Sequence, residues 1–163
     1  MTRYPVRQFK KFPQPILTVF PEVFHVLKIL EAAYQYNKNL RKKTNRWQLT
    51  DKEMQDYEQQ LSVRGSEIMG TLEIDSINVK LPIYHSTSEG VLQLGIGHIE
   101  GSSLPVGGLD THAALTGHSG LPEAKLLTDL GKLSIGDTFR IHVLNQELAS
   151  AMFCLRTRIL LAL

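Results

Sequence analysis

A histidine between two glycines is the residue of this chain best suited to chemistry. His118 follows a short apolar stretch, residues 113–115, and lies between Gly117 and Gly120. The glycines let the backbone turn sharply, which predicts an imidazole held at a strand end and not inside a sheet. Such an imidazole can transfer a proton near neutral pH. The alternative is a turn histidine that only hydrogen-bonds to backbone.

Blocks of residues around this histidine stand in a characteristic order. They are Ile77 to His85, Val91 to Gln93, Gly97 to Gly101, Ser103 to Gly108, Thr111 to His112, Thr116 to His118, and Ala124 to Leu130. In this order, from Met69 to about Leu148, the sequence resembles the class C, pilus-assembling sortases.

The resemblance implies a fold, an activity and partners. Sortases of this class are built on an eight-stranded closed β-barrel and are cysteine transpeptidases of the Gram-positive cell envelope. They cleave LPXTG-type sorting signals after the Thr and pass the acyl group to an amine, which in pilus assembly is a lysine of the next pilin subunit. His118 matches the catalytic histidine of the family. The implied partners are sorting-signal peptides and pilin subunits.

Two further residues of the family's active site cannot be assigned. The family has a cysteine in a Thr-Leu-x-Thr-Cys context and an arginine on the following strand. Here the resemblance fades at about residue 148, and Cys154, the only cysteine, has another context. We therefore interpret the chain as truncated after about residue 148 and expect it to be inactive alone. The alternative is a non-catalytic peptide- or partner-binding module derived from a sortase.

Cys154 itself allows two interpretations. Arg156 and Arg158 are close to it in sequence, and neighbouring cations favour the nucleophilic thiolate. A free cysteine in an apolar segment is more commonly a small hydrophobe, which is the interpretation adopted here.

Composition and short motifs exclude several other functions. The net charge of +2 is too small to favour nucleic acid as a partner. A single cysteine cannot form an internal disulfide. The sequence has no zinc-type Cys/His spacing, no phosphate-binding loop and no dinucleotide fingerprint. We therefore expect no metal, no cofactor and no nucleic acid.

The resemblance implies a membrane-associated protein of the cell envelope, because class C sortases are usually anchored by a hydrophobic segment. In this sequence the apolar residues 16–30 are interrupted by Pro21, Glu22, His25 and Lys28. A spanning helix needs about 20 predominantly apolar residues. The sequence therefore shows no clear transmembrane segment and no clear export signal.

The chain divides into four predicted parts. Residues 1–20 are a loose N-terminal arm, 21–68 an N-terminal helical region, 69–148 a partial sortase β-barrel, and 149–163 a divergent tail. Pro21 is suited to the first position of a helix that ends near Lys43. Thr50 to Glu53 reads as a capping box that starts a second helix, which Gly65 and Ser66 terminate.

The predicted fold is mostly β: an incomplete sortase-type barrel with N-terminal helices and short helices between strands. Strands begin at Thr71, and the apolar alternation changes parity at residues 75–76, which requires a turn or bulge. The later predicted elements are a helical turn at 86–92, a strand at 113–116, a helix at 122–130 and a strand at 138–143. Val91 and Leu92 of the turn are expected in the core. Leu126, Leu127 and Leu130 of the helix are expected to face inward. An open barrel is expected to be marginally stable alone, unless the tail pairs in place of a missing strand.

Several side chains carry individual predictions. No Asp-Pro lid element is present, so Trp47 is either the aromatic that plugs the groove or a tryptophan packed between the two helices. Asp110 or Asp129 could orient His118, although Asp129 is better explained as a solvated helix residue. The other histidines are assigned structural roles: His85, His98 and His112 near strand ends, and His25 and His142 facing solvent.

Overall fold

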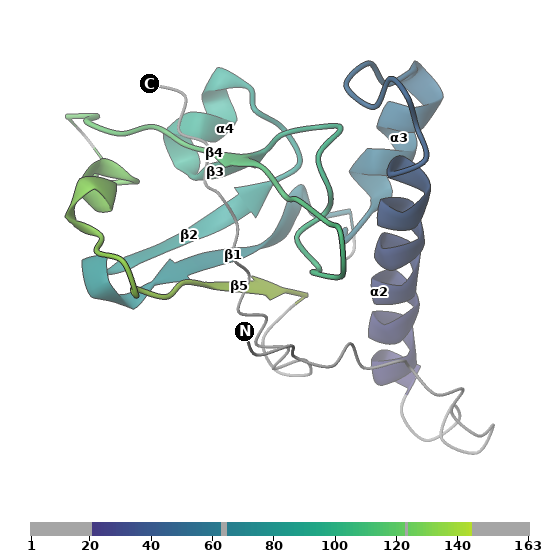
Figure 1. Ribbon diagram of the computed structural model, residues 1–163, viewed down its shortest axis with the longest axis horizontal. Helices are drawn as coiled ribbons and strands as arrows, with labels where there is room; N and C mark the ends of the chain where they lie inside the picture. Colours follow the sequence, from purple (N-terminus) through teal and green to yellow (C-terminus); the bar gives the residue numbers. More distant parts are fainter. Residues whose placement is uncertain (1–20, 63–64, 123, 145–163) are drawn as a thin grey trace.

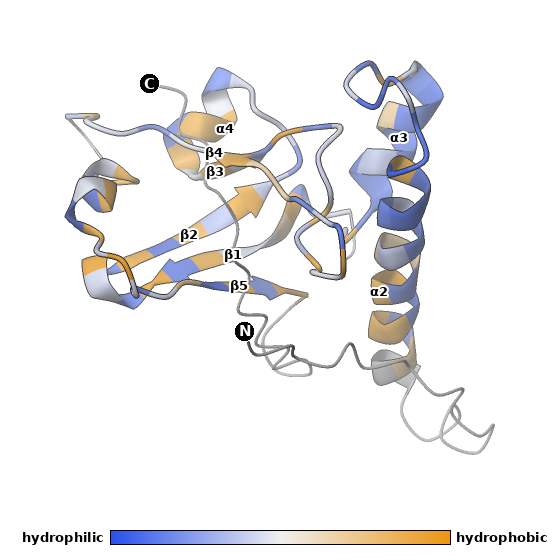
Figure 2. Ribbon diagram, in the orientation of Figure 1, coloured by the Kyte–Doolittle hydropathy of each residue, from blue (hydrophilic) through white to orange (hydrophobic). Residues whose placement is uncertain are grey.

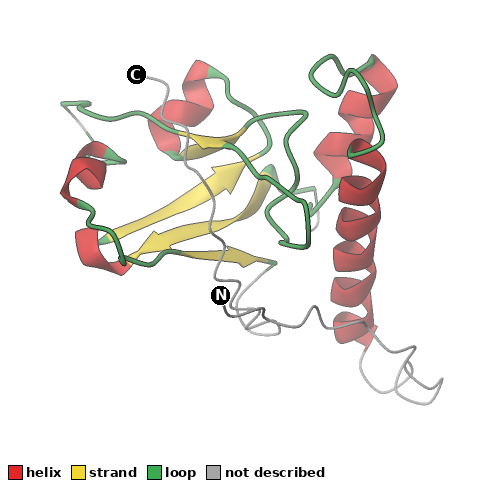
Figure 3. Ribbon diagram, viewed as in Figure 1, coloured by secondary structure: helices red, strands yellow, loops and turns green. Residues whose placement is uncertain are grey.

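The computed structural model describes residues 21–62, 65–122 and 124–144. The predicted arm (1–20), the tail (149–163) and the pairing suggested for the tail lie outside the described residues. Two helices, α2 (Pro21–Leu40) and α3 (Asp51–Gln59), stand together on one side of a sheet, as Figures 1 and 3 show. Pro21 opens α2 as predicted, and the helix ends at Leu40, before the predicted end at Lys43.

The second helix begins where its capping box predicts. The Glu53 carboxylate accepts a hydrogen bond from the backbone N–H of Thr50 at 2.9 Å, and the capping box is complete. The same carboxylate forms an ion pair with Lys43. The Lys43 contact and the Thr50 bonds hold the pKa of Glu53 down, at about 2. This arrangement ties the α2–α3 loop to the first turn of α3.

The sheet has five strands in the order β4-β3-β2-β1-β5. They are β1 (Ile68–Ile74), β2 (Val79–Tyr84), β3 (Ile96–His98), β4 (Leu115–Thr116) and β5 (Arg140–Val143). The β2–β3 pair is parallel, and the β1–β2, β1–β5 and β3–β4 pairs are antiparallel. Within the described residues the sheet does not close. The predicted fold, an incomplete barrel with N-terminal helices and short helices between strands, is confirmed.

The change of parity at residues 75–76 is absorbed by a short turn. A 3-10 helix, η1 (Asp75–Ile77), joins β1 to β2, and Asn78 then adopts a left-handed backbone with φ of 51°. The turn lets Leu72 and Ile74 of β1 and Ile83 of β2 all reach the core. The predicted start of β1 at Thr71 is wrong, because the strand already begins at Ile68.

The short connecting helices differ most from their predictions. Helix α4 (Glu89–Leu94) forms in the predicted region, but Val91 and Leu92 are only half-buried and the helix has no buried residue. The predicted helix at 122–130 is wrong, because the helical turn is η2 (Thr128–Lys132). Leu126 and Leu127 are still buried, as predicted, while Leu130 is half-buried. The last strand is shorter than predicted and starts at Arg140.

The core joins the inner face of the sheet to the two helices. Its members include Met69, Leu72, Ile83, Ile96, Leu115 and Ile141 from the strands and Leu30, Ala33 and Tyr57 from the helices. Figure 2 shows how apolar and polar residues alternate along the strands. Asn37 of α2 also makes two hydrogen bonds to the backbone of Leu104, at 3.0 and 2.7 Å. These bonds fix the helical region on the long connection between β3 and β4.

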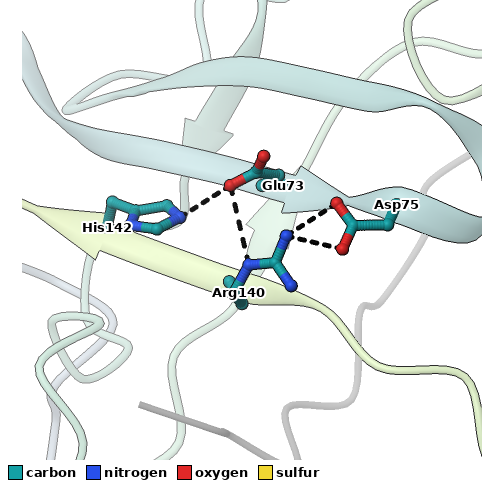
Figure 4. A network of polar contacts seen from close by, with 4 residues as sticks. All are labelled: Glu73, Asp75, Arg140 and His142. Atoms are coloured by element: carbon teal, nitrogen blue, oxygen red, sulfur yellow. Dashed lines mark hydrogen bonds and ion pairs between the residues drawn. The ribbon is translucent and has the colours of Figure 1, made fainter. Parts of the chain in front are cut away.

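A polar network fixes β5 against β1 on the outer face of the sheet (Figure 4). Arg140 donates to both oxygens of Asp75 at 2.6 Å and lies 3.6 Å from Glu73. His142 contacts Glu73 at 2.8 Å, and this bond is the main reason that the pKa of Glu73 is lowered. His142 thus lies on the outer face of the sheet and not in the core, but only 23% of its side chain is exposed, because its ring packs against a carboxylate across the strand pair.

Candidate active site

His118 lies just beyond the end of β4, at the place predicted from the glycines around it. Its side chain is half-buried, with 31% exposed. Its carbonyl accepts a hydrogen bond from the backbone N–H of Leu127 at 3.1 Å. The following turn is fixed by Gly120, whose N–H donates to Thr128 Oγ1 at 2.9 Å. The backbone from His118 to Gly120 is therefore held by Leu127 and Thr128, at the start of η2.

Gly117 allows the backbone before His118 to pack closely on the core. A Cβ at this position would lie 2.9 Å from Ile96 Cδ1 and 3.0 Å from Leu127 Cδ1. The close approach brings the end of β4 next to the start of β3, with which it pairs through Gly97 opposite Thr116. The glycine therefore sets the position of the imidazole through packing.

The side chain in contact with the imidazole is that of Glu89, the first residue of α4. Glu89 Oε1 lies 3.0 Å from His118 Nε2. Gln93, one turn later in α4, donates to the same oxygen at 3.3 Å. The bond from His118 is the main cause that lowers the pKa of the Glu89 carboxyl, with Gln93 contributing next. The sequence analysis did not predict Glu89 as a partner of His118. The only signal for it in the sequence is its place at the start of a short predicted helical turn.

The two aspartates considered as partners of His118 lie elsewhere. Asp110 forms an ion pair with Arg41 of the α2 end at 3.2 Å. Asp129 pairs with Lys125 at 2.9 Å and Lys132 at 2.8 Å. Its pKa is lowered, first by the bond from Lys132 and then by that from Lys125. Neither aspartate contacts the imidazole. Asp129 lies in the helical turn η2, but its side chain is only 18% exposed and paired with two lysines, so the prediction that it is solvated is wrong.

The two buried histidines form a structural cluster around Tyr57. The Tyr57 hydroxyl lies 2.7 Å from the carbonyl of His85 and 2.9 Å from His98 Nδ1. The other ring nitrogen of His98 is 3.0 Å from the carbonyl of Ser103. Burial lowers the pKa of His98 to about 4, so the ring is neutral near pH 7, and burial raises the pKa of Tyr57. These side chains join α3 to the strands, and none of their hydrogen bonds reaches His118.

The remaining histidines and Trp47 lie outside this cluster. His25 and His112 are exposed. Trp47, in the loop between α2 and α3, is 57% exposed and lies against the Gly101 backbone. It is therefore wrong to place Trp47 between the two helices, since it faces the β3–β4 connection. Its assignment as a lid residue remains a prediction.

Other candidate sites give little further chemistry. Cys154, Arg156 and Arg158 lie outside the described residues. Across the described ranges, no group of three or more His, Cys, Asp or Glu residues could hold a metal ion. A surface hollow of about 650 Å³ lies between α2 and residues 107–111, lined in part by Lys38 and Arg41, and it does not include His118.

In the part of the chain that the structure describes, no helix has the length and apolar composition needed to cross a membrane.

Comparison with known proteins assigns the fold to a family. The sortase domain model matches residues 72–150. Sortase C1 from Streptococcus agalactiae is 43% identical with a TM-score of 0.70, and the similarity covers 82% of this chain and 72% of that one. Sortase C-1 from Actinomyces oris is 37% identical with a TM-score of 0.66, over 76% of this chain and 70% of that one.

A third relative is sortase C from Streptococcus pneumoniae. It is 36% identical, with a TM-score of 0.62 over 82% of this chain and 70% of that one, and its structure was described for its bearing on catalysis and pilin substrate specificity. No curated protein sequence gave a significant match. The chain therefore belongs to the sortase family, and within that family to class C. Sortases are in general enzymes of the cell surface.

Proposed function

We propose that this chain supplies the proton-transfer half of a sortase acyl-transfer site, acting on LPXTG-type sorting signals and pilin subunits at the cell envelope. The observation that carries the proposal is the position of His118, half-buried at the end of β4 in a class C sortase fold. In the family's reaction a cysteine thiolate attacks the Thr carbonyl and an arginine stabilises the oxyanion. The histidine donates a proton to the leaving amine, and a pilin lysine then resolves the thioester.

We propose further that the 163-residue chain does not join peptides by itself. No residue of it matches the family's cysteine or arginine, and covalent catalysis requires an activated nucleophile. Incubation with an LPXTG-type peptide and an amine, followed by mass spectrometry, is expected to show neither a thioester nor a joined product. Turnover that is lost in both Cys154→Ala and His118→Ala would contradict this part of the proposal.

A chimera tests the role of His118 directly. Residues 21–144 of this chain are joined to the C-terminal strands of S. agalactiae sortase C1, which is 43% identical. As a sortase of class C, this relative is expected to supply the family's cysteine and arginine. The chimera is expected to transfer the acyl group of an LPXTG-type peptide to an amine. His118→Ala should lower the rate by about 10²–10⁴-fold, the usual effect of losing a general acid or base.

The matched control for the chimera is His112→Ala. His112 is exposed and contributes only backbone hydrogen bonds to the β3–β4 connection, so its loss should leave the rate unchanged. A folded chimera that remains active in His118→Ala would show that this histidine is not the acid.

A further inference from the structure

The contact between His118 and Glu89 is built by the fold and does not arise from neighbouring residues in sequence. The two residues are 29 positions apart, and their side chains meet at 3.0 Å. Glu89 is more exposed than His118, at 67% against 31%, so the carboxylate lies on the solvent side of the ring. Each partner therefore depends on a separate structural element for its place.

Helix α4 is fixed at its C-terminal end by Gly95, the residue that follows it. A Cβ on Gly95 would lie 2.7 Å from the carbonyl oxygen of Pro82 and 3.1 Å from Tyr84 Cε2, both in β2. The chain then enters β3, which pairs with β2 on one side and β4 on the other. The end of α4 is thus held against β2 and the end of β4 against β3, and the two ends adjoin, because a Cβ on Gly117 would lie 3.5 Å from the carbonyl oxygen of Gly95. Figure 1 shows α4 beside β3 and β4.

The chemistry of the two groups determines where the ring proton lies. An ionised carboxylate has no proton to donate, so a hydrogen bond between Glu89 and His118 requires the proton on Nε2. In the neutral ring, the lone pair is then on Nδ1. Within the described residues, His118 Nδ1 has no hydrogen-bond partner, and it is the nitrogen left to exchange protons with reacting groups.

We propose that Glu89 is a positioning residue for His118: it holds the ring proton on Nε2 and leaves Nδ1 as the nitrogen that transfers protons during acyl transfer. The inference rests on the proposed function of His118. A carboxylate that orients a catalytic imidazole and stabilises its charged form is an established way to fix tautomer and ring orientation. In this chain the task falls to Glu89, because Asp110 and Asp129 are already paired with basic side chains.

The geometric part of the proposal is tested by NMR on the 163-residue chain with labelled histidine side chains. A hydrogen-bonded Nε2–H signal that exchanges slowly with water is expected for His118, together with a lone-pair nitrogen shift for Nδ1. Glu89→Ala should abolish the slow exchange. Glu58→Ala, which removes an exposed carboxylate of α3, should preserve it. A proton found on Nδ1, or a signal unchanged in Glu89→Ala, would overturn the proposal.

A second measurement tests the contact through the pKa of the Glu89 carboxyl. Carbon-detected titration of Glu89 should show its pKa rising toward the ordinary value in His118→Ala, because the bond from the imidazole is what chiefly lowers it. His112→Ala should leave the Glu89 titration as it is in the unsubstituted chain. Identical titrations in the unsubstituted chain and His118→Ala would also overturn the proposal.

The chimera separates the positioning role from the proposed function. In an active chimera, Glu89→Ala should lower kcat about tenfold with KM within about twofold, since orientation of the acid acts on the chemical step and not on peptide binding. Glu58→Ala should change neither constant. An unchanged kcat in Glu89→Ala would overturn the positioning role. A folded but inactive chimera with the NMR signatures in place would contradict the proposed function and still support the Glu89 contact.

Discussion

At the scale of single residues, two histidines of this chain lie in contrasting environments. His118 is half-buried beside a carboxylate, whereas His98 is fully buried among neutral partners. Burial without a countercharge disfavours the imidazolium ion of His98. Two predictions test the buried cluster.

Tyr57→Phe is expected to destabilise the chain by about 1–3 kcal/mol, since the loss of the hydroxyl leaves the buried His98 Nδ1 without its partner. Urea unfolding measures the change. The matched control is Tyr36→Phe, whose ring neighbours Tyr57 but is only half-buried, and it should cost less than about 0.5 kcal/mol. Equal losses in the two variants would show that the hydrogen bond is not the source of the stability.

The stability of the chain should fall on mild acidification because of His98. Its pKa is about 4 in the folded chain, below the value of about 6.5 for a free histidine, so between these values the unfolded state binds a proton that the folded state excludes. The unfolding free energy should therefore drop by about 3 kcal/mol as pH falls from about 6.5 to about 4.

The comparison that isolates His98 is with His98→Gln. This variant should lose less stability over the same pH range, while His112→Gln should follow the unsubstituted chain because His112 is exposed. Parallel curves for the unsubstituted chain and His98→Gln would contradict the assignment.

At the scale of elements, the site depends on where short segments end. Helix α4 and strand β4 are both brief, and each is held by contacts at its end and not by its own length. Gly95 and Gly117 occupy these ends, where a side chain would meet atoms of neighbouring strands. An isolated helix of this size is unstable in water, so its place must come from packing.

Gly95→Ala should therefore destabilise the chain by about 1–3 kcal/mol, because its Cβ would press on the backbone oxygen of Pro82 at 2.7 Å. Gly90→Ala is the matched control within the same helix, since a Cβ there meets nothing within 4 Å. It should be neutral or stabilise by up to about 1 kcal/mol through better helix propensity. Thermal unfolding distinguishes the two, and a harmless Gly95→Ala would mean that α4 is not fixed at this end.

At the scale of the whole molecule, the described sheet ends in two strands that each pair on one side. These are β4 and β5 in the order β4-β3-β2-β1-β5. An unpaired strand edge offers backbone donors and acceptors to other chains and favours association. Charged groups lie on the outer face beside the β5 edge, in the network of Glu73, Asp75, Arg140 and His142. These charges oppose pairing of β5 with another chain only in part.

The 163-residue chain is therefore expected to associate as its concentration rises and to unfold with low cooperativity. Sedimentation velocity and calorimetry measure these properties. The chimera, which adds the remaining barrel strands of the S. agalactiae relative, should be monomeric under the same conditions. A monodisperse, cooperatively unfolding 163-residue chain would contradict the prediction.

The sequence by itself determined the features that depend on neighbouring residues. The glycines around His118 predicted its place at a strand end, and the spacing of Thr50 and Glu53 predicted the start of α3. The change of parity at residues 75–76 predicted a turn or bulge, which the structure forms as η1. Each of these follows from backbone freedom, a local hydrogen bond or the two-residue period of a strand.

Only the tertiary structure decided the contacts between distant segments. Glu89, and not Asp110 or Asp129, is the partner of His118 because the backbone that follows α4 packs beside the backbone that follows β4, at Gly95 and Gly117. The helix predicted at 122–130 was displaced to η2, because Leu127 donates its N–H to His118 and not to a preceding turn. Such contacts depend on how elements pack, and local periodicity carries no information about which distant side chain fills the remaining space.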